Sequence, residues 1–182
     1  MGLEIDWDEF AVAYGGHLGP GGDNRARRAL EVILGEQAIR SAVDCILAVR
    51  PGAALALDVL SLLRPGIAAE YCHEISISSS DIDARRRAVG LLQDVGDRRA
   101  LPWLSGYLDD SDSIIQMCGA SVLDHLLFLD LVEPQEPEGL LKKAQHHENE
   151  AVRERAESIR IFLRDRAGGD NQEETEDPDS PL

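Results

Sequence analysis

Apolar residues recur at intervals of three and four along almost the whole chain, which is the spacing of helices that bury one face. The only alternation typical of a strand is short, from Ile75 to Ser78, and the helical spacing of the residues before it outweighs it. The pattern predicts helices over about residues 6–14, 24–34, 36–49, 53–63, 66–77, 82–95, 98–108, 113–129, 138–146 and 150–166.

Helix-breaking residues fall between these segments. Gly35 separates the second helix from the third. Pro-Gly pairs at 51–52 and 65–66 lie in the next two connections between helices. Short polar side chains stand where two later helices should begin, so we expect Ser80 or Asp81 and Asn149 to be N-caps.

Three of the expected helices share an internal pattern, and they align when Ala84, Ile115 and Val152 are placed in register. Each has a small residue four positions later and an aliphatic residue three positions after that. The small residues are Ala88, Gly119 and Ala156. A small residue in mid-helix lets the next helix approach closely, which a stack of helical hairpins requires once per repeat.

The repeat spacing is 31 residues from 53 to 84 and from 84 to 115, and 37 from 115 to 152. The segment beginning at residue 53 follows the pattern less closely. The longer last interval coincides with the Pro- and Glu-rich stretch 133–138, which we interpret as a loop insertion. These features predict an all-α fold of repeated antiparallel helix pairs.

The residues from Gly96 to Leu104 and from Leu108 to Gln116 resemble the HEAT-repeat consensus of a second helix, an Asp-rich turn and the next first helix. The resemblance covers roughly residues 50–166. It implies a right-handed superhelix of HEAT-like helix pairs with about 9–10 helices.

In the HEAT family, an Asp in the turn and an Arg six residues later form a ladder along the stack. Asp110 matches the Asp, but position 116 is Gln. At the two other turns the Arg is present and the Asp is replaced, so the expected ladder is interrupted. These pairs are Ser79 with Arg85 and His147 with Arg153.

The chain divides into three expected regions. Residues 1–23 form a short N-terminal helix and a Gly-rich connector, residues 24–167 form the helical repeat domain, and residues 168–182 form an acidic tail. The tail has too few apolar residues to fold, so we expect it to be disordered.

The composition indicates the cellular compartment and the class of binding partner. The formal net charge of -16 disfavours nucleic acid, whose binding needs clustered Lys and Arg, and it favours a basic protein. Three Cys without paired spacing, no secretory signal and no long apolar run favour a cytoplasmic protein with free thiols and no membrane contact. Arginines recur early in the repeated helices, at 85–87 and at 153 and 155, but neighbouring acids indicate local ion pairs.

Candidate catalytic patterns are weak. The Gly-rich stretch 15–22 lacks the Gly-Lys-Ser/Thr ending of a phosphate loop, and His73 and the pair His146-His147 lack metal-ligand spacing. Cys72 and His73 are neighbours on a helix and cannot easily face each other. We therefore expect no catalytic, cofactor or metal site and a binding protein that is not an enzyme.

The candidate binding residues are aromatic and acidic side chains of the second helices, which line the concave surface in HEAT stacks. Aromatic anchors inside an acidic rim suit a basic protein. Trp103 is the strongest candidate, while Tyr107 fits the core at least as well. The candidates are Glu70, Tyr71, Glu74, Trp103, Tyr107, Asp109, Asp110 and Asp112.

A second resemblance concerns function: short acidic proteins of this organisation are similar to the stand-alone bacterial HEAT-type immunity proteins of polymorphic toxin systems. It implies a monomer that neutralises a toxin by occlusion in a 1:1 complex. The first alternative is a HEAT-repeat scaffold or regulatory subunit that holds two partners. The second is a HEAT-fold enzyme of the glycosylase-like or lyase-like kind.

Overall fold

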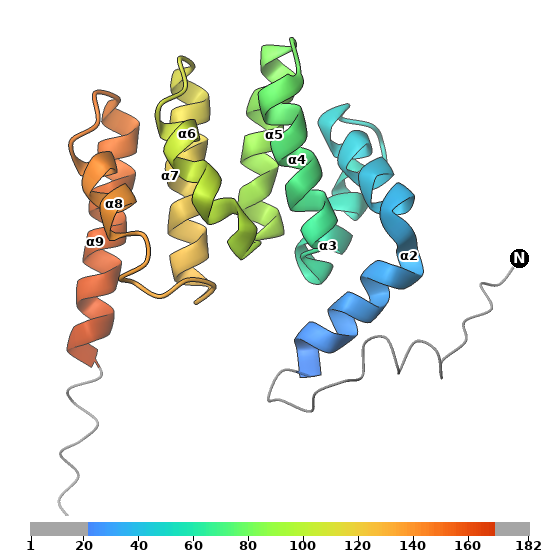
Figure 1. Cartoon of the computed structure of the whole chain (residues 1–182), viewed down its shortest axis with the longest axis horizontal. Coiled ribbons are helices and arrows are strands. Elements are labelled where there is room, and N and C mark those ends of the chain that lie inside the picture. The colour runs from blue at the N-terminus through green and yellow to red at the C-terminus, as the bar shows by residue number, and fades with distance from the viewer. Residues whose placement is uncertain (1–21, 170–182) are drawn as a thin grey trace, which may run out of the picture. The chain divides into compact units, whose positions relative to one another are not determined.

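The computed structural model describes residues 22–169, and this part of the chain is entirely helical, without a strand (Figure 1). The predicted N-terminal helix, the Gly-rich connector up to residue 21 and the tail from residue 170 lie outside the described residues. The packing divides the chain into two compact units, of which unit 1 ends at Trp103 and unit 2 begins at Leu104.

Unit 1 contains four α-helices and a 3-10 helix. They are α2 (Gly22–Leu47), α3 (Ala53–Leu63), α4 (Gly66–Ser78), α5 (Ile82–Val95) and η1 (Arg98–Trp103). The helices alternate between two layers: α2, α4 and η1 lie side by side in one, and α3 packs beside α5 in the other. Consecutive helices α2 with α3 and α4 with α5 pack across the layers as hairpins. The core between them is aliphatic and includes Ile39, Val43, Leu60, Ala68, Cys72, Val89 and Leu92.

The helix boundary predicted at Gly35 is confirmed. The span α2 consists of two helices joined across a kink at Gly35, whose angles are non-helical, φ 75° and ψ 157°. That positive φ suits glycine, and it produces the bend of α2 (Figure 1). The helix predicted over 98–108 is instead a 3-10 helix followed by a short α-helix. Pro102, which has no N–H to donate, lies inside the 3-10 turn.

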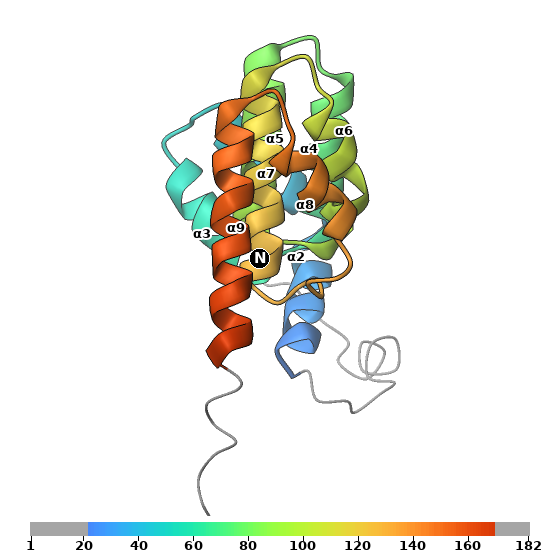
Figure 2. The same ribbon diagram turned by 90° about the vertical axis from the view of Figure 1, so that its left-hand side faces the viewer.

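Unit 2 consists of α6 (Leu104–Leu108), α7 (Ser113–Phe128), α8 (Glu138–Gln145) and α9 (Glu150–Gly169). Here α6 packs on α7 and α8 on α9 as hairpins, while α7 lies beside α9 and α6 beside α8. In Figure 2, α8 runs next to α9. The predicted N-caps are confirmed, since the Asp81 side chain accepts from Asp83 N and the Asn149 side chain from Ala151 N at 3.1 Å.

The three small residues of the repeat pattern are all buried. Ala88 and Ala156 are 0% exposed. Gly119 lies so close to α6 that an added Cβ would stand 2.8 Å from the Cβ of Tyr107. In unit 2, α6 can therefore pack on α7 only because position 119 has no side chain. The ring of Tyr107 is buried there and belongs to the core.

Hydrogen bonds to backbone carbonyls take the place of the interrupted ladder. Arg85 Nε donates to Ser76 O, in the last turn of α4, at 2.7 Å. Gln116 Nε2 donates to Asp110 O and Arg153 Nη1 to His147 O, each at 2.7 Å and each in the loop before its helix. Each of the three side chains thus ties the start of its helix to the part of the chain that precedes it.

Within unit 2 these bonds continue from one turn to the other. Gln116 Oε1 accepts from Asn149 Nδ2 at 2.9 Å, and Nε2 of His147 lies 2.8 Å from Leu108 O. Buried or half-buried hydrogen bonds of this kind each stabilise a fold by about 0.5–1.5 kcal/mol. They fix the α8–α9 turn against the α6–α7 turn.

The close approach at Gly119 predicts opposite effects of one substitution at two glycines. Gly119→Ala should lower the free energy of unfolding by roughly 1–3 kcal/mol, because the new methyl group displaces α6. Gly139→Ala in α8 meets no atom within 4 Å, so it should raise the free energy by about 0.4–1 kcal/mol. Urea unfolding of both variants measures this. Two shifts in the same direction would contradict the account.

Candidate partner-binding surface

The free side of the layer formed by α2, α4 and η1 carries a continuous set of polar and aromatic side chains, which we name the aromatic–acidic face. Residues of α2 spaced by four place their side chains on one side of that helix, toward Tyr71 and Glu74 of α4. The face consists of Glu36, Arg40, Asp44, Glu70, Tyr71, Glu74, Arg99 and Trp103.

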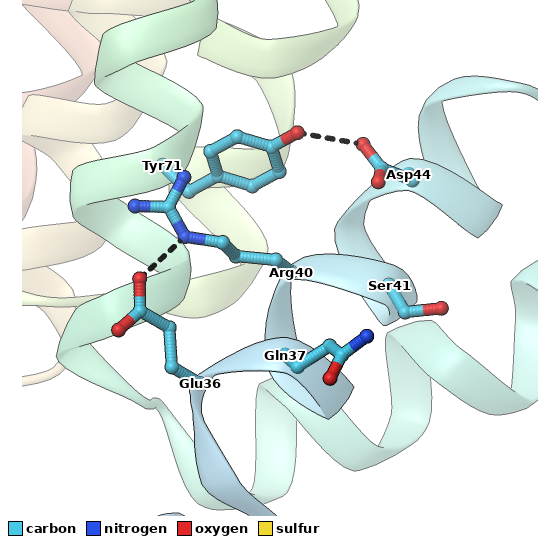
Figure 3. Close-up of a pocket in the computed structure, with 6 residues that line it drawn as sticks. All are labelled: Glu36, Gln37, Arg40, Ser41, Asp44 and Tyr71. Atoms are coloured by element: carbon cyan, nitrogen blue, oxygen red, sulfur yellow. Dashed lines mark hydrogen bonds and ion pairs between the residues drawn. The ribbon is translucent and has the colours of Figure 1, made fainter.

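Tyr71 and Arg40 form the centre of this face (Figure 3). The Arg40 guanidinium lies over the Tyr71 ring, with 4.4 Å from Cζ to the ring centroid, in a cation–π contact. The Tyr71 hydroxyl donates to Asp44 Oδ1 at 3.0 Å. Around them is a depression of about 570 Å³ lined by Glu36, Gln37, Arg40, Ser41, Asp44 and Tyr71.

Carboxylates outnumber guanidinium groups at this centre. Arg40 pairs with Glu36 at 2.8 Å and with Glu74 at 3.1 Å, so one positive charge serves two negative ones. Asp44 adds a third carboxylate through its bond to the tyrosine. These groups are solvent-exposed, where single ion pairs contribute little to stability. Their combined negative potential is what an incoming basic group would meet.

The electrostatics of Tyr71 follow from these neighbours. Burial raises the pKa of its hydroxyl, the hydrogen bond to Asp44 raises it further, and the positive charge of Arg40 partly lowers it. The phenol therefore stays protonated at neutral pH and acts as a hydrogen-bond donor.

An ion pair between Arg99 and Glu70 extends the face toward η1. Arg99 Nη1 donates to Glu70 Oε1 at 2.8 Å, joining η1 to α4. The guanidinium lies over Gly66, where an added Cβ would stand 1.8 Å from Nη1. The first residue of α4 therefore leaves room for Arg99 to reach Glu70.

Trp103 lies at the end of η1 and stacks on His73 of α4. The ring centroids are 4.1 Å apart and the planes differ by 2°. Partial burial lowers the pKa of His73, which favours the neutral form of the imidazole in this stack. Both residues are half-buried. The sequence offered no sign that His73 would meet a residue 30 positions away.

The other candidate residues belong to unit 2 and have structural roles there. Asp109 Oδ2 pairs with Lys143 Nζ at 2.6 Å. Asp110 accepts from Asp112 N, and Asp112 caps α7 by accepting from Ile114 N and Ile115 N. With Tyr107 buried, Asp109 is the most exposed member of this group.

Unit 2 has a polar depression of its own, of about 680 Å³. It lies between the α6–α7 and α8–α9 turns and is lined by Leu108, Asp109, Ser113, Gln116, Lys143, His146, His147, Glu148 and Asn149. Lys143, Gln116, His147 and Asn149 are held there by the hydrogen bonds described above.

The other residues that the sequence analysis considered for catalysis, metal binding or a basic surface make contacts within their own unit or lie outside the described part of the chain. Burial raises the pKa of the Cys72 thiol to about 12, which makes it an inert core residue. Arg86 pairs with Asp83 at 3.0 Å, as expected of a local ion pair. Arg155 pairs instead with Asp124 of α7, 31 positions away, at 2.9 Å. Within residues 22–169, no three His, Cys, Asp or Glu side chains converge as metal ligands. The Gly-rich stretch 15–22 lies almost wholly outside the described residues.

The chain matches no protein-family model, no curated protein and no solved structure. Between residues 22 and 169, no helix combines the length and apolar content needed to span a bilayer.

The pKa of Tyr71 gives a direct test of the geometry at the centre of the face. Asp44→Asn removes a negative charge that favours the protonated phenol, so the pKa of Tyr71 should fall toward its ordinary value while burial keeps it somewhat raised. An ultraviolet titration of tyrosine ionisation measures the change. The titration curve of the Tyr71→Phe variant is subtracted to isolate the signal of Tyr71. Asp58→Asn on α3 is the matched control. Identical curves for the two variants would show that Asp44 does not bond Tyr71.

Proposed function

We propose that this protein is a HEAT-type protein-binding module and that the aromatic–acidic face is its receptor surface. The proposal includes a right-handed superhelix of HEAT-like helix pairs, with the layer that contains α2 and α4 on its concave side. The alternating layers within each unit and the buried small residues at 88, 119 and 156 support this architecture.

The observation that carries the proposal is the composition of the face. Two half-exposed aromatic rings, Tyr71 and Trp103, lie among four carboxylates and only two guanidinium groups. Exposed aromatic anchors surrounded by unbalanced charge are typical of protein interfaces. A basic partner would be steered to the surface by charge and held by the rings.

The existing ion pairs indicate how a partner would bind. Arg40 already lies over the Tyr71 ring, in the position that a cationic side chain prefers. Arg99 already donates a hydrogen bond to the carboxylate of Glu70. A lysine or arginine of the partner would find Asp44 and the second oxygens of Glu36 and Glu74 still accessible. Binding at these positions needs side-chain adjustment but no change of the helices.

Within this class, an immunity protein that blocks a cognate bacterial toxin agrees best with an acidic binding surface and a 1:1 complex. Occlusion needs complementary packing and no catalytic group. A cytoplasmic location is part of the proposal, since there the protein would meet a toxin that reaches the cell interior.

A scaffold that holds two partners is the second candidate. It is favoured by the two separate depressions, one centred on Tyr71 in unit 1 and one beside His147 in unit 2. If the protein is a scaffold, substitutions in one unit should abolish the capture of one partner while the other partner stays bound.

The experiment starts from the immobilised full chain and a lysate of its source cells, followed by calorimetry with the captured protein. Trp103→Ala and the pair Glu70→Lys with Glu74→Lys should each weaken binding by at least about 2 kcal/mol, roughly thirtyfold. The captured protein should be basic, and its affinity should fall as salt is raised.

Two matched variants serve as controls. Phe128→Ala removes an exposed aromatic ring of unit 2, and Asp58→Lys reverses an exposed acid of α3. Both should leave the affinity unchanged, and circular dichroism should show that all variants are folded. Equal affinities for the face variants and the controls would remove the aromatic–acidic face from consideration.

A further inference from the structure

Three groups of the aromatic–acidic face hold the guanidinium of Arg40, and together they form a binding site for that group. Its Cζ lies 4.4 Å from the centroid of the Tyr71 ring, and its Nε donates to Glu36 Oε1 at 2.8 Å (Figure 3). Its Nη1 donates to Glu74 Oε2 at 3.1 Å. One planar group thus lies over an aromatic ring and reaches a carboxylate through each of two nitrogens.

This arrangement suits a guanidinium better than an ammonium group. Guanidinium is a planar fork whose N–H groups point in fixed directions, whereas ammonium is a compact point charge. The two carboxylates come from different helices, Glu36 from α2 and Glu74 from α4, and each is bound by a different nitrogen. A lysine would have to serve both carboxylates from one nitrogen while it lies over the ring. The site therefore favours arginine.

The fold does not depend on the contacts of Arg40. Its side chain is 38% exposed and its two carboxylate partners are 61% and 58% exposed, and ion pairs in such positions contribute little to stability. The two helices are anchored instead by buried core residues, which include Ile39 and Val43 of α2 and Ala68 and Cys72 of α4. The contacts of Arg40 can therefore be exchanged for others while the helices keep their places.

The site is open to a group that arrives from solvent. Asp44 lines the same depression of about 570 Å³ as Arg40 and Tyr71. An arginine of the partner would first meet Asp44 and the second oxygens of Glu36 and Glu74. It could then replace Arg40 over the ring, and the number of charge-assisted hydrogen bonds would stay the same.

We propose that the site formed by Tyr71, Glu36 and Glu74 accepts an arginine side chain of the basic partner, and that Arg40 occupies it until the partner binds. The inference rests on the proposed function, since it names the group of the partner that enters the receptor surface. Arg40 is then an internal competitor that the partner must displace, and this displacement lowers the apparent affinity. Removing Arg40 should strengthen binding, although Arg40 belongs to the receptor surface.

Nα-acetyl-arginine amide tests the site without the partner. The full chain with isotope-labelled tyrosine gives nuclear magnetic resonance signals from three rings, and Tyr71→Phe identifies the signal of Tyr71. In Arg40→Ala the site is empty, so the amide should shift this signal until it saturates. Nα-acetyl-lysine amide at the same ionic strength should bind several-fold more weakly. In the unsubstituted chain Arg40 competes, so the arginine amide should also bind several-fold more weakly there.

Arg86→Ala is the matched control. Arg86 also pairs with a carboxylate of its own helix and its side chain is similarly exposed, at 32%, but it lies on α5 outside the face. The control removes the same charge, and Tyr71 should respond in it as in the unsubstituted chain. Arg40→Gln, which keeps part of the side-chain stem, should behave like Arg40→Ala, and circular dichroism should show that all variants are folded.

Two results of the titration would overturn the proposal. One is a Tyr71 signal that responds no more strongly in Arg40→Ala and Arg40→Gln than in Arg86→Ala. The other is an equal response to the arginine and lysine amides.

Calorimetry with the captured partner separates this inference from the proposed function. Arg40→Ala should raise the affinity several-fold, Arg86→Ala should leave it unchanged, and Trp103→Ala should lower it. If Trp103→Ala lowers the affinity but Arg40→Ala does not raise it, the face is the receptor surface and the partner does not use the arginine site. If Trp103→Ala has no effect, the proposed function is wrong, and the proposed role of the site in binding the partner is wrong with it.

Discussion

Close helix packing at small residues is the constraint on which the structure depends. Unit 2 shows it most directly, since α6 lies against the bare backbone of Gly119 and leaves no room for a methyl group. Ala156 of α9, in the same unit, is fully buried in a small cluster with Val152, Ala120 and Ala144. In unit 1 the equivalent position, Ala88, is fully buried as well. With few aromatic residues available, short side chains are what allow the helices to exclude water.

This packing determines which side chains remain for binding. Each hairpin buries one side of both its helices, so the free side of each layer keeps the polar residues. On the layer of α2 and α4, those residues bond to one another across neighbouring helices, through Arg40 with Glu74 and Tyr71 with Asp44. The face is therefore ordered before any partner arrives, which reduces the entropy lost on binding.

The sequence predicted most of the fold because the helical signals are local. Apolar spacing located the helices, and short polar residues located their caps at Asp81 and Asn149. It failed at Pro102, where the apolar pattern continues across a change to 3-10 geometry. It also treated the turn ladder as interrupted at Gln116, because matching to a consensus considers one side chain at a time. The amide of Gln116 reaches the same turn through a backbone carbonyl.

The candidate site was only partly predictable. The acidic and aromatic residue types on the α4 and η1 layer were found from their positions in the repeat. Their pairings were not, because Arg40 with Tyr71 and His73 with Trp103 join residues about 30 positions apart. No local pattern encodes such contacts. The sequence had already ranked Trp103 above Tyr107, and in the structure Tyr107 is buried while Trp103 is half-buried.

Amide hydrogen exchange of the full chain, with and without the basic protein it captures, measures the central claim most directly. The account predicts that protection on binding is concentrated in residues 36–44, 70–74 and 98–103, with α3 and α5 unchanged. Protection confined to α3, α5 or α9, with no change along α2 and α4, would contradict it.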